Sequence, residues 1–362
     1  MFSGLARIIP PPPYITLPCV GVDISDTSLK YVSFKPTLRK GKNRVLDTYG
    51  EITIPTGIVN RGEVQDPPKL AAALKEFKEK SGAEFVRLSL PEERAYLFET
   101  DVKRSTSFKE VQGLLEFRLE ENVPIPSRDV FFDYSILPSP EHSKTTTVSV
   151  VAYAKQTVQT YYDACVEAGL RPVSFEVEAQ AMARAVVPRH ASGAVMIVDF
   201  GKTRSGIGIV HKGTLLYTST IDIGGNQLSI ALRKILGDKT EAELSHIKNS
   251  QGLVRGVNSF DVREALISTV SVVRDELVTR MQYWHTRTGN DDERRINSII
   301  LCGGSANLKG IPEYFTETLN VPTIRGNVWE NAFPLADYVP PIDRQHSFGY
   351  AAAIGLALKS TI

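Results

Sequence analysis

Two short segments of this 362-residue chain share a pattern that could bind a phosphorylated ligand. They are Val20–Lys30 (VGVDISDTSLK) and Ile197–Gly206 (IVDFGKTRSG). Each has an apolar strand, an aspartate, a small residue two positions later, a polar turn and a returning strand. A tight turn of small and hydroxyl residues points backbone N–H groups at an anion. An aspartate at the end of the strand can hold the water shell of a Mg²⁺ ion that bridges phosphates.

The candidate phosphate-binding residues lie in these two turns. They are Asp23, Ser25, Thr27, Ser28 and Lys30 in the first turn, and Gly201, Lys202, Thr203, Arg204 and Ser205 in the second. Lys202 and Arg204 either attract phosphate oxygens or are exposed turn charges, and the sequence leaves both readings open. Asp23 and Asp199 are the candidate Mg²⁺ residues, each acting through bound water.

The spacing of the repeat predicts a duplicated α/β fold. The two aspartates are 199 − 23 = 176 residues apart, about half of the chain. A cleft between two similar halves follows naturally from such a duplication. Apolar periodicity predicts strands at 15–22, 29–34, 45–54, 85–90, 194–200 and 297–302, a hairpin at 206–218, and helices from Pro67, at 227–236 and at 261–285.

Residues 93–169 have a pattern of their own, which predicts an inserted α+β subdomain. Ser107 and Glu110 form a capping box that begins a helix, and Pro124 cannot continue it. The complete expected organisation is a tail at 1–14, a first half at 15–92 and 170–192, the insert, and a second half at 193–345. The second half includes a helical subdomain at about 226–290, and a C-terminal helix at 346–360 packs back on the first half.

Composition excludes several classes of protein. Hydrophobic residues make up 42% and charged residues 23%, which are ordinary globular values. A net charge of +1 argues against a nucleic-acid coat, so no nucleic-acid partner is expected. Three separated cysteines and six histidines, none of them three or four residues from another, give no zinc motif. Gly201-Lys202-Thr203 is not a Walker A loop, because Met196 stands where that motif needs glycine.

The two hairpins, followed by Gly303-Gly304 after an apolar strand, resemble the actin-like (ribonuclease H-like) ATPase fold with a central nucleotide cleft. The insert resembles the branch that contains the cell-division protein FtsA and the pilus-assembly protein PilM. The segments most similar to the PilM family pattern are Glu116–Pro126 followed by Asp133-Tyr134, then Ile299–Ile311, Gly349–Leu358 and Met1–Leu5.

The resemblance implies a bacterial cytoplasmic protein, peripheral to the inner face of the cytoplasmic membrane, that binds ATP with Mg²⁺. It implies that the protein docks the cytoplasmic N-terminal peptide of a PilN-like single-span membrane protein, in a groove between the insert and the first half. It also implies contact with the pilus assembly platform and its ATPases, and it allows self-association.

The resemblance assigns further site residues. Adenosine would contact Gly225, Lys248, Gly303, Gly304, Ser305 and Leu308. Glu178 would position the water that attacks ATP in a slow hydrolysis, or it is a helix-start glutamate favoured by the helix dipole. The chain departs from the pattern at Ser25, where the family usually has glycine, and at Ser245, where related actins have an acidic residue three positions before a lysine.

Two alternatives to a PilM-like scaffold follow from the same fold. An FtsA-like division anchor would end in an amphipathic helix after a linker, whereas this sequence stops at Ile362, directly after the last expected helix. An actin-fold kinase needs a general-base carboxylate and an acceptor pocket, and no segment of the first half supplies them convincingly. We therefore expect an ATP-binding scaffold with at most slow ATP hydrolysis.

Overall fold

The computed structural model describes residues 18–35, 44–104, 106–139, 142–254, 260–289 and 291–359. The chain divides into two compact units. Unit 1 comprises Met1–Val186, Val328–Ile342 and Tyr350–Ile362, and unit 2 comprises Val187–Asn327 and Asp343–Gly349. The expected tail at 1–14 lies outside the described residues. None of the described helices has the length and apolar character needed to cross a bilayer.

Unit 1 is built on a five-stranded sheet with the order β10-β6-β1-β2-β3. Its strands are β1 (Cys19–Ile24), β2 (Ser28–Phe34), β3 (Leu46–Thr53), β6 (Phe85–Leu90) and β10 (Arg171–Val177). The first three form an antiparallel meander, while β1, β6 and β10 are parallel. β1 extends two residues beyond the predicted end at Val22, because Asp23 and Ile24 still pair with Lys30 and Leu29.

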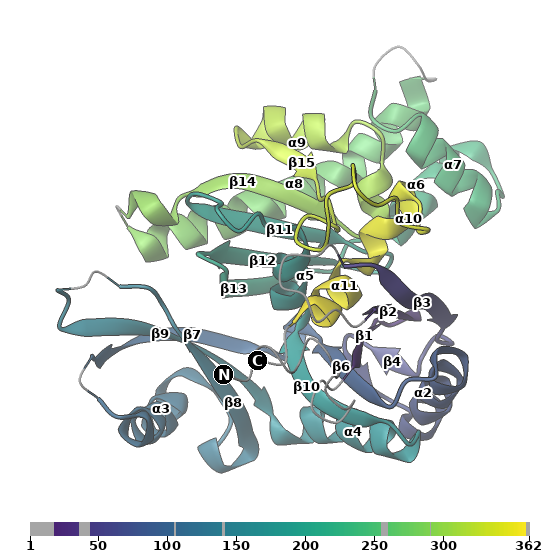
Figure 1. Ribbon diagram of the computed structural model, residues 1–362. Helices are drawn as coiled ribbons and strands as arrows, with labels where there is room; N and C mark the ends of the chain where they lie inside the picture. The colour runs from purple at the N-terminus through teal and green to yellow at the C-terminus, as the bar shows by residue number, and fades with distance from the viewer. Residues whose placement is uncertain are drawn as a thin grey trace. The chain divides into compact units, whose positions relative to one another are not determined.

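Helices cover both faces of this sheet (Figure 1). On one face are α2 (Pro67–Ser81) and α4 (Lys155–Glu167), and on the other are α5 (Glu178–Val186) and α11 (Ala351–Leu358). Small residues allow α11 to approach closely. A Cβ on Gly21 would lie 2.2 Å from the Ala353 carbonyl oxygen, and one on Gly355 would lie 1.7 Å from the Ala181 carbonyl oxygen. Either substitution would therefore push α11 away from its neighbours.

The insert has its own core. Its three-stranded sheet has the order β7-β9-β8, made of β7 (Tyr96–Lys103), β8 (Val130–Ile136) and β9 (Thr145–Ala154). Helix α3 (Phe108–Asn122) begins with the predicted capping box of Ser107 and Glu110. Residues that α3 and the sheet bury together include Phe98, Leu115, Leu119, Val148 and Val150.

Helix α4 does not belong to that core, although the sequence assigns it to the insert. It packs on α2 and β10. Its apolar face, made of Tyr161, Ala164 and Cys165, is buried there. The Tyr161 hydroxyl also donates to the Gly62 carbonyl (3.0 Å), at the tip of the short hairpin of β4 (Val59–Asn60) and β5 (Glu63–Val64).

Unit 2 repeats the strand order of unit 1. Its five-stranded sheet runs β13-β12-β11-β14-β15, made of β11 (Ala194–Phe200), β12 (Ser205–His211), β13 (Thr214–Ile221), β14 (Ile296–Cys302) and β15 (Thr323–Arg325). Again the first three strands are antiparallel and the central strand pairs in parallel with the fourth. The equal strand order and directions in the two sheets support the predicted duplication.

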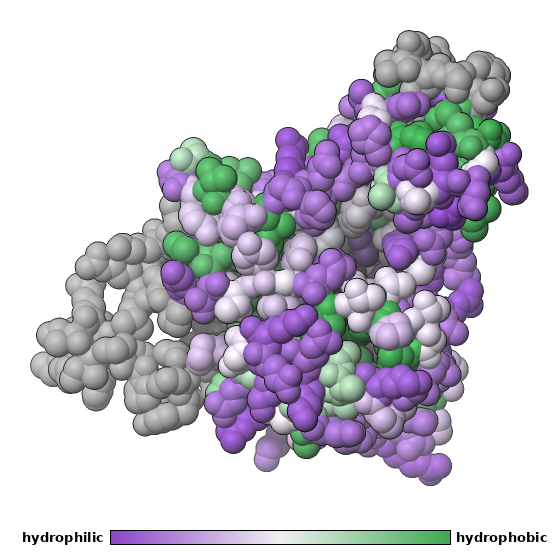
Figure 2. All heavy atoms as spheres, turned by 90° about the vertical axis from the view of Figure 1, so that its right-hand side faces the viewer, coloured by the Kyte–Doolittle hydropathy of each residue, from purple (hydrophilic) through white to green (hydrophobic). Residues whose placement is uncertain are grey.

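The helices of unit 2 are α6 (Gly225–Leu236), α7 (Glu241–Ser250), α8 (Phe260–Thr288), α9 (Ile311–Leu319) and α10 (Arg344–Ser347). The long α8 buries the predicted stripe of Val262, Leu266, Val270, Val273, Leu277, Met281 and Trp284. The apolar pattern does not predict α7 or α9 as separate helices, although the capping box of Thr240 and Glu243 marks the start of α7. On the face drawn in Figure 2, apolar residues are interrupted by extensive hydrophilic areas.

The segment Val328–Ile342 belongs to unit 1, whereas the sequence places it in the second half. It has no long helix or strand, and its aromatic side chains pack against one another. Trp329 stacks on Phe333 at 5.2 Å, and Phe333 meets Tyr338 edge-on at 4.8 Å. The Asn331 side chain donates to the Arg184 carbonyl of α5 (3.1 Å), which fastens the segment to unit 1.

Candidate functional site

The first predicted turn, between β1 and β2, bonds largely to itself. The Ser25 hydroxyl accepts hydrogen bonds from the N–H groups of Thr27 (3.4 Å) and Ser28 (3.1 Å), and the Ser25 N–H donates to the Ser28 carbonyl (2.9 Å). Ser25 does so without a positive φ. Because these N–H groups have acceptors within the turn, they are less available to an anion than those of a glycine turn. The Asp26 carboxylate, which accepts from the Gly62 N–H (3.4 Å), adds a negative charge.

Asp23 is a buried carboxyl group one residue before the end of β1. Burial raises its pKa, while a hydrogen bond from the Ser89 hydroxyl (2.7 Å) and the charge of Lys30 act to lower it. The Lys30 ammonium is held by the Ser28 hydroxyl (2.7 Å) and by Glu51 (3.1 Å). This edge of unit 1 therefore presents a carboxyl group that is desolvated but hydrogen-bonded.

Other carboxylates gather at the same edge of the sheet. Glu93 follows β6 and Glu178 begins α5 directly after β10, so both stand at carboxyl ends of parallel strands. Burial raises the pKa of Tyr161, and the charges of Glu93, Asp26, Glu178 and Asp23 raise it further. In α/β folds, ligands bind at such strand ends. Among the described residues, no three His, Cys, Asp or Glu side chains converge to hold a metal directly.

The second predicted turn, between β11 and β12, is bonded to two neighbouring segments. The Gly201 N–H donates to the carbonyls of Asp199 and Arg204 (both 3.0 Å) and closes the turn. The Gly201 carbonyl accepts from the Gly225 N–H (2.9 Å) and from the Ser305 hydroxyl (3.0 Å). The turn, the first residue of α6 and the 3₁₀ turn after β14 thus form one hydrogen-bonded unit.

This second turn is basic, whereas the first is acidic. Lys202 and Arg204 occupy its tip, and the Lys202 carbonyl accepts from the Asn226 N–H (2.9 Å) at the start of α6. The charge of Lys202 also contributes to lowering the pKa of Lys248, so these two ammonium groups act on the same region of unit 2. A helix N-terminus beside two cationic side chains is suited to an anionic ligand.

Two glycines allow the backbone to approach this turn. Gly303 has φ +80°, and a Cβ there would lie 2.3 Å from Asp199 Oδ1 and 2.6 Å from the Phe200 carbonyl oxygen. The neighbouring Gly304 is different, because its Cβ would meet nothing within 4 Å. A Cβ on Gly225 would lie 2.5 Å from the Ser305 hydroxyl. Gly303 and Gly225 are therefore required by packing, while Gly304 leaves open space.

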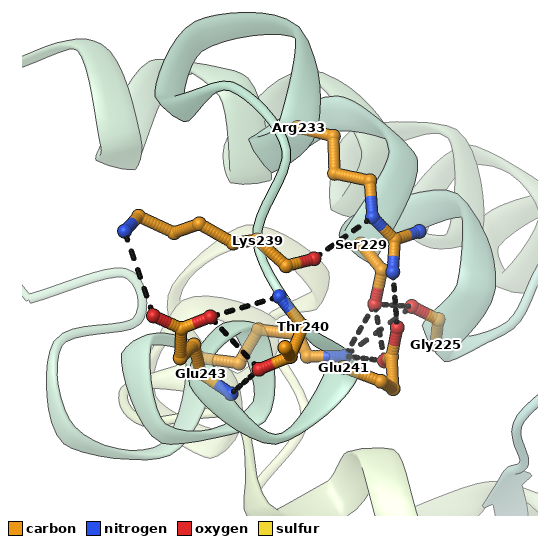
Figure 3. Close-up of polar contacts among 8 residues, drawn as sticks. Gly225, Ser229, Arg233, Lys239, Thr240, Glu241 and Glu243 are labelled. Atoms are coloured by element: carbon orange, nitrogen blue, oxygen red, sulfur yellow. Dashed lines mark hydrogen bonds and ion pairs between the residues drawn. The ribbon is translucent and has the colours of Figure 1, made fainter.

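Lys248 is buried and tied to the start of α6, where Figure 3 shows its partners Gly225, Ser229 and Glu241. Its ammonium donates to the Ser229 hydroxyl (2.8 Å) and to the Gly225 carbonyl (3.5 Å), and it pairs with Glu241 Oε1 (3.2 Å). Burial lowers the pKa of Lys248, and the Glu241 charge opposes that effect. Glu241 also binds Arg233 (3.0 Å) and accepts from Ser229 (2.6 Å). This network joins α7 to α6.

Arg325 also holds the loop after β14. Its guanidinium donates to the carbonyls of Ala306 (2.7 Å) and Leu308 (2.9 Å). The Lys309 N–H donates to the Lys248 carbonyl (3.1 Å), so the loop is also fastened to α7. The Leu308 side chain is buried, and it supports the loop rather than forming part of its surface.

The predicted site residues thus form two groups, one in each unit. Asp23, Ser25, Thr27, Ser28, Lys30 and Glu178 lie at the strand ends of unit 1, and Asp199, Gly201–Ser205, Gly225, Lys248 and Gly303–Leu308 lie together in unit 2. Sequence reasoning missed Ser89, Glu241 and Ser229. Only Glu241 had a local signal, as the first residue of a capped helix. Glu241 pairs with Lys248, whose expected acidic neighbour is replaced by Ser245.

Two comparisons with known proteins cover nearly the whole chain. The family model for the type IV pilus assembly protein PilM matches residues 21–361. A chain of a solved PilM–PilN type IV pilus biogenesis complex is 20% identical with a TM-score of 0.75, over 95% of this chain and 98% of that one.

More distant structures share the architecture. The ethanolamine utilization protein EutJ from Carboxydothermus hydrogenoformans is 17% identical with a TM-score of 0.54, over 97% of this chain and 90% of that one. MreB5 of Spiroplasma citri bound to AMPPNP is 14% identical with a TM-score of 0.52, over 93% of each chain. At these identities the likeness concerns the fold, and it confirms the predicted duplicated actin-like fold. Nearly the whole length of this chain matches the family model, and the chain belongs to the PilM family of type IV pilus assembly proteins.

Proposed function

We propose that this protein is an ATP-binding scaffold of type IV pilus assembly that works at the cytoplasmic face of the inner membrane. The observation that carries the nucleotide part is the Gly201–Ser205 turn. This turn carries Lys202 and Arg204, and its backbone carbonyls accept hydrogen bonds from the start of α6 and from Ser305 in the loop after β14. Membership of the PilM family carries the pilus part.

The phosphates of ATP would lie on the basic turn of unit 2. Lys202 and Arg204 supply positive charge, and the N–H groups at the start of α6 supply donors. The adenosine would lie beside Lys248 and the Gly303–Leu308 loop, which Arg325 holds in shape. That a solved MreB5 is bound to AMPPNP supports a nucleotide as the ligand class for this fold.

Asp23 in unit 1 and Asp199 in unit 2 are each proposed as residues that would hold Mg²⁺ through water. The donor set fits a hard cation because carboxylate oxygens and water are the ligands that Mg²⁺ prefers. The ion would neutralise charge on the phosphates when bound. Glu178 stands at a strand end beside other carboxylates, where it would orient water for slow hydrolysis.

The partner would be the cytoplasmic N-terminal peptide of a PilN-like single-span membrane protein. The support is the solved PilM–PilN complex, whose PilM-like chain has the fold of this protein. The peptide would lie between the insert and the sheet of unit 1. There the Tyr153 hydroxyl donates to the Pro91 carbonyl (3.2 Å) and fixes the root of the insert. Docking to such a peptide would bring the protein to the membrane surface.

Calorimetric titration with ATP and Mg²⁺ tests the nucleotide site. We expect Asp199→Ala to abolish Mg²⁺-dependent binding without changing the circular dichroism spectrum. Asp238→Ala, which removes an exposed carboxylate from the same unit, should bind as the unchanged protein does. Equal binding by Asp199→Ala and the unchanged protein would remove Asp199 from the site.

Two further measurements test the remaining assignments. Glu178→Ala should lower the rate of phosphate release from ATP while leaving the dissociation constant within about twofold. An undiminished rate would mean that Glu178 is only a helix-start residue. Cross-linked pull-down from the membranes of the source cells should recover a small single-span protein with a short cytoplasmic N-terminus. Recovery of a division-ring polymer instead would favour the FtsA-like alternative.

A further inference from the structure

The outward face of α3 in the insert carries a stripe that the fold itself does not use. The stripe consists of Lys109, Gly113, Glu116, Phe117, Glu120 and Glu121, which recur every three or four residues. The opposite face of the helix holds Val111, Leu115 and Leu119 in the core of the insert. We call the outward set the α3 stripe.

Phe117 is the first unusual member of the α3 stripe. Its side chain is 64% exposed, more than any other exposed aromatic residue among those described. A phenylalanine has no polar atom to hydrate, and a large ring left in water gains nothing for folding. Phe117 therefore has no role in the packing of the insert that would explain its position.

Gly113 is the second unusual member. It is exposed in the interior of a 15-residue helix and lies one turn from Phe117 on the same face. Glycine at such a position costs about 1 kcal/mol of helix stability relative to alanine. A Cβ on Gly113 would meet nothing within 4 Å, so no contact inside the protein requires the glycine. A gap beside a projecting ring is the geometry that lets another helix approach closely.

The charge of the α3 stripe indicates which kind of partner it would bind. Around Phe117 and Gly113 stand three carboxylates, Glu116, Glu120 and Glu121, and one ammonium, Lys109. Among the described residues, Glu121 pairs with Arg118 (2.7 Å), Glu120 accepts a hydrogen bond from the Ser127 hydroxyl (3.3 Å), and Glu121 alone of the three has a cationic partner. A second copy of the same helix would bring like charges together, and an anionic membrane surface would also be repelled. A basic partner is attracted at every one of these positions except Lys109.

We propose that the α3 stripe is a docking site for a basic amphipathic helix of another protein. Phe117 would enter the apolar face of that helix, Gly113 would allow its backbone to approach, and Glu116 and Glu120 would pair with its Lys or Arg residues. The proposal does not depend on nucleotide binding or on the groove between the insert and the sheet.

The test uses a defined probe with the full-length protein. The probe is a fluorescein-labelled 18-residue peptide of leucine and lysine, with leucine on one helical face and lysine on the flanks. A control peptide has glutamate in place of lysine. Fluorescence anisotropy at about 50 and 300 mM NaCl should show binding of the lysine peptide that weakens as salt rises, because the attraction is electrostatic. The glutamate peptide should not bind.

The variants separate docking from folding. Phe117→Ala should weaken probe binding at least tenfold, whereas Tyr162→Ala, which removes an exposed aromatic ring from α4, should not. The paired change Glu116→Gln with Glu120→Gln should remove most of the salt dependence, and Glu79→Gln on α2 should leave it unchanged. Gly113→Ala gives the sharpest result, since we expect weaker binding together with a melting temperature that is equal or higher by about 2 °C.

Two results would overturn the proposal. One is equal probe binding by Phe117→Ala, Gly113→Ala and the unchanged protein, which would place the peptide elsewhere. The other is sedimentation showing that the protein self-associates, and that Phe117→Ala abolishes this association. A second copy of the chain would then be the occupant of the α3 stripe.

Discussion

The turn of unit 1 and the turn of unit 2 have the same backbone plan but opposite charge. Asp23 and Asp199 occupy the same register, seven residues before their antiparallel partners Lys30 and Gly206. The first turn adds another carboxylate at its tip, while the second carries Lys202 and Arg204 instead. Duplication thus preserved the scaffold, and the side chains on it diverged.

The two aspartates also differ in what lies beside them on the next parallel strand. Asp23 accepts a hydrogen bond from Ser89 on β6. Asp199 is the register partner of Cys302 on β14, whose thiol has a pKa raised by burial and by the Asp199 charge. The hydroxyl stabilises the charge of Asp23, whereas the thiol offers Asp199 little. The two aspartates of the repeat therefore lie in different polar surroundings.

The largest effect should come from Gly303, the glycine after β14 that packs against Asp199 and Phe200 at the second turn. We expect Gly303→Ala to lower the free energy of unfolding by about 3 kcal/mol, because φ +80° is strained for alanine and the new methyl group would strike Asp199. Nucleotide binding should be lost with it. Gly304→Ala is the matched control, since its methyl group meets only open space. Equal melting temperatures for the two variants would contradict this account of the loop.

Substitution of Lys202 tests whether the positive charge of the second turn contributes to ATP binding. Lys202→Ala should weaken ATP binding by about tenfold, since a charge-assisted contact with phosphate contributes roughly 1.5 kcal/mol or more. Lys212→Ala removes the same type of charge at the other end of β12, where it pairs with Glu293, and should leave binding unchanged. Titration calorimetry at fixed salt measures both. Equal losses would mean that Lys202 contributes only to the general field of the protein.

The pH dependence of stability tests the buried carboxyl group of Asp23 in unit 1. Because the pKa of Asp23 is raised in the folded protein, folding favours its protonated form. Its ionisation therefore subtracts stability, and this loss sets in as pH rises from the ordinary aspartate value of 3.8 through the raised folded value. Asp23→Asn should flatten that part of a plot of melting temperature against pH and should raise stability near neutrality. A plot identical to that of the unchanged protein would contradict the raised pKa.

The smallest effect should come from making the first turn more like a glycine turn. Ser25→Gly releases the N–H groups of Thr27 and Ser28 from the Ser25 hydroxyl. We expect ATP affinity to rise by about two- to threefold while stability falls by roughly 1 kcal/mol, the net value of a hydrogen bond with added backbone freedom. Thr27→Ala removes a neighbouring hydroxyl without freeing those N–H groups and serves as the control. Unchanged affinity in Ser25→Gly would show that the first turn does not contact phosphate.

Local pattern was sufficient to predict the strands and the long helices. Strands at 85–90 and 194–200 have the predicted bounds, because apolar runs with turn residues at both ends define a buried strand. Helix α4 illustrates the limit. Its amphipathic pattern predicts a helix, but the pattern does not say which apolar surface covers it, and tertiary packing placed it on α2 and β10.

The candidate site was less accessible to prediction, because its partners come from distant positions. Ser89 is 66 residues from Asp23, and the Ser305 hydroxyl reaches Gly201 across 104 residues. The periodicity of apolar residues does not predict contacts between residues so far apart in the sequence. Glu241 is nearer to Lys248, but seven residues is two helical turns, so only the folded α6–α7 pair shows why the two side chains meet.

The packing of α11 against β1 has a consequence for the order in which the protein forms during synthesis. Gly21 in β1 touches Ala353 and Leu356, more than 330 residues later in the chain. A ribosome delivers residues from the N-terminus onward, so the first strand of unit 1 emerges long before the helix that covers it. The five strands of the unit 1 sheet all lie within 19–177, so they are made before the strands of unit 2, which lie within 194–325. The apolar face of the unit 1 sheet that α11 covers must therefore be shielded from solvent until this final helix is made.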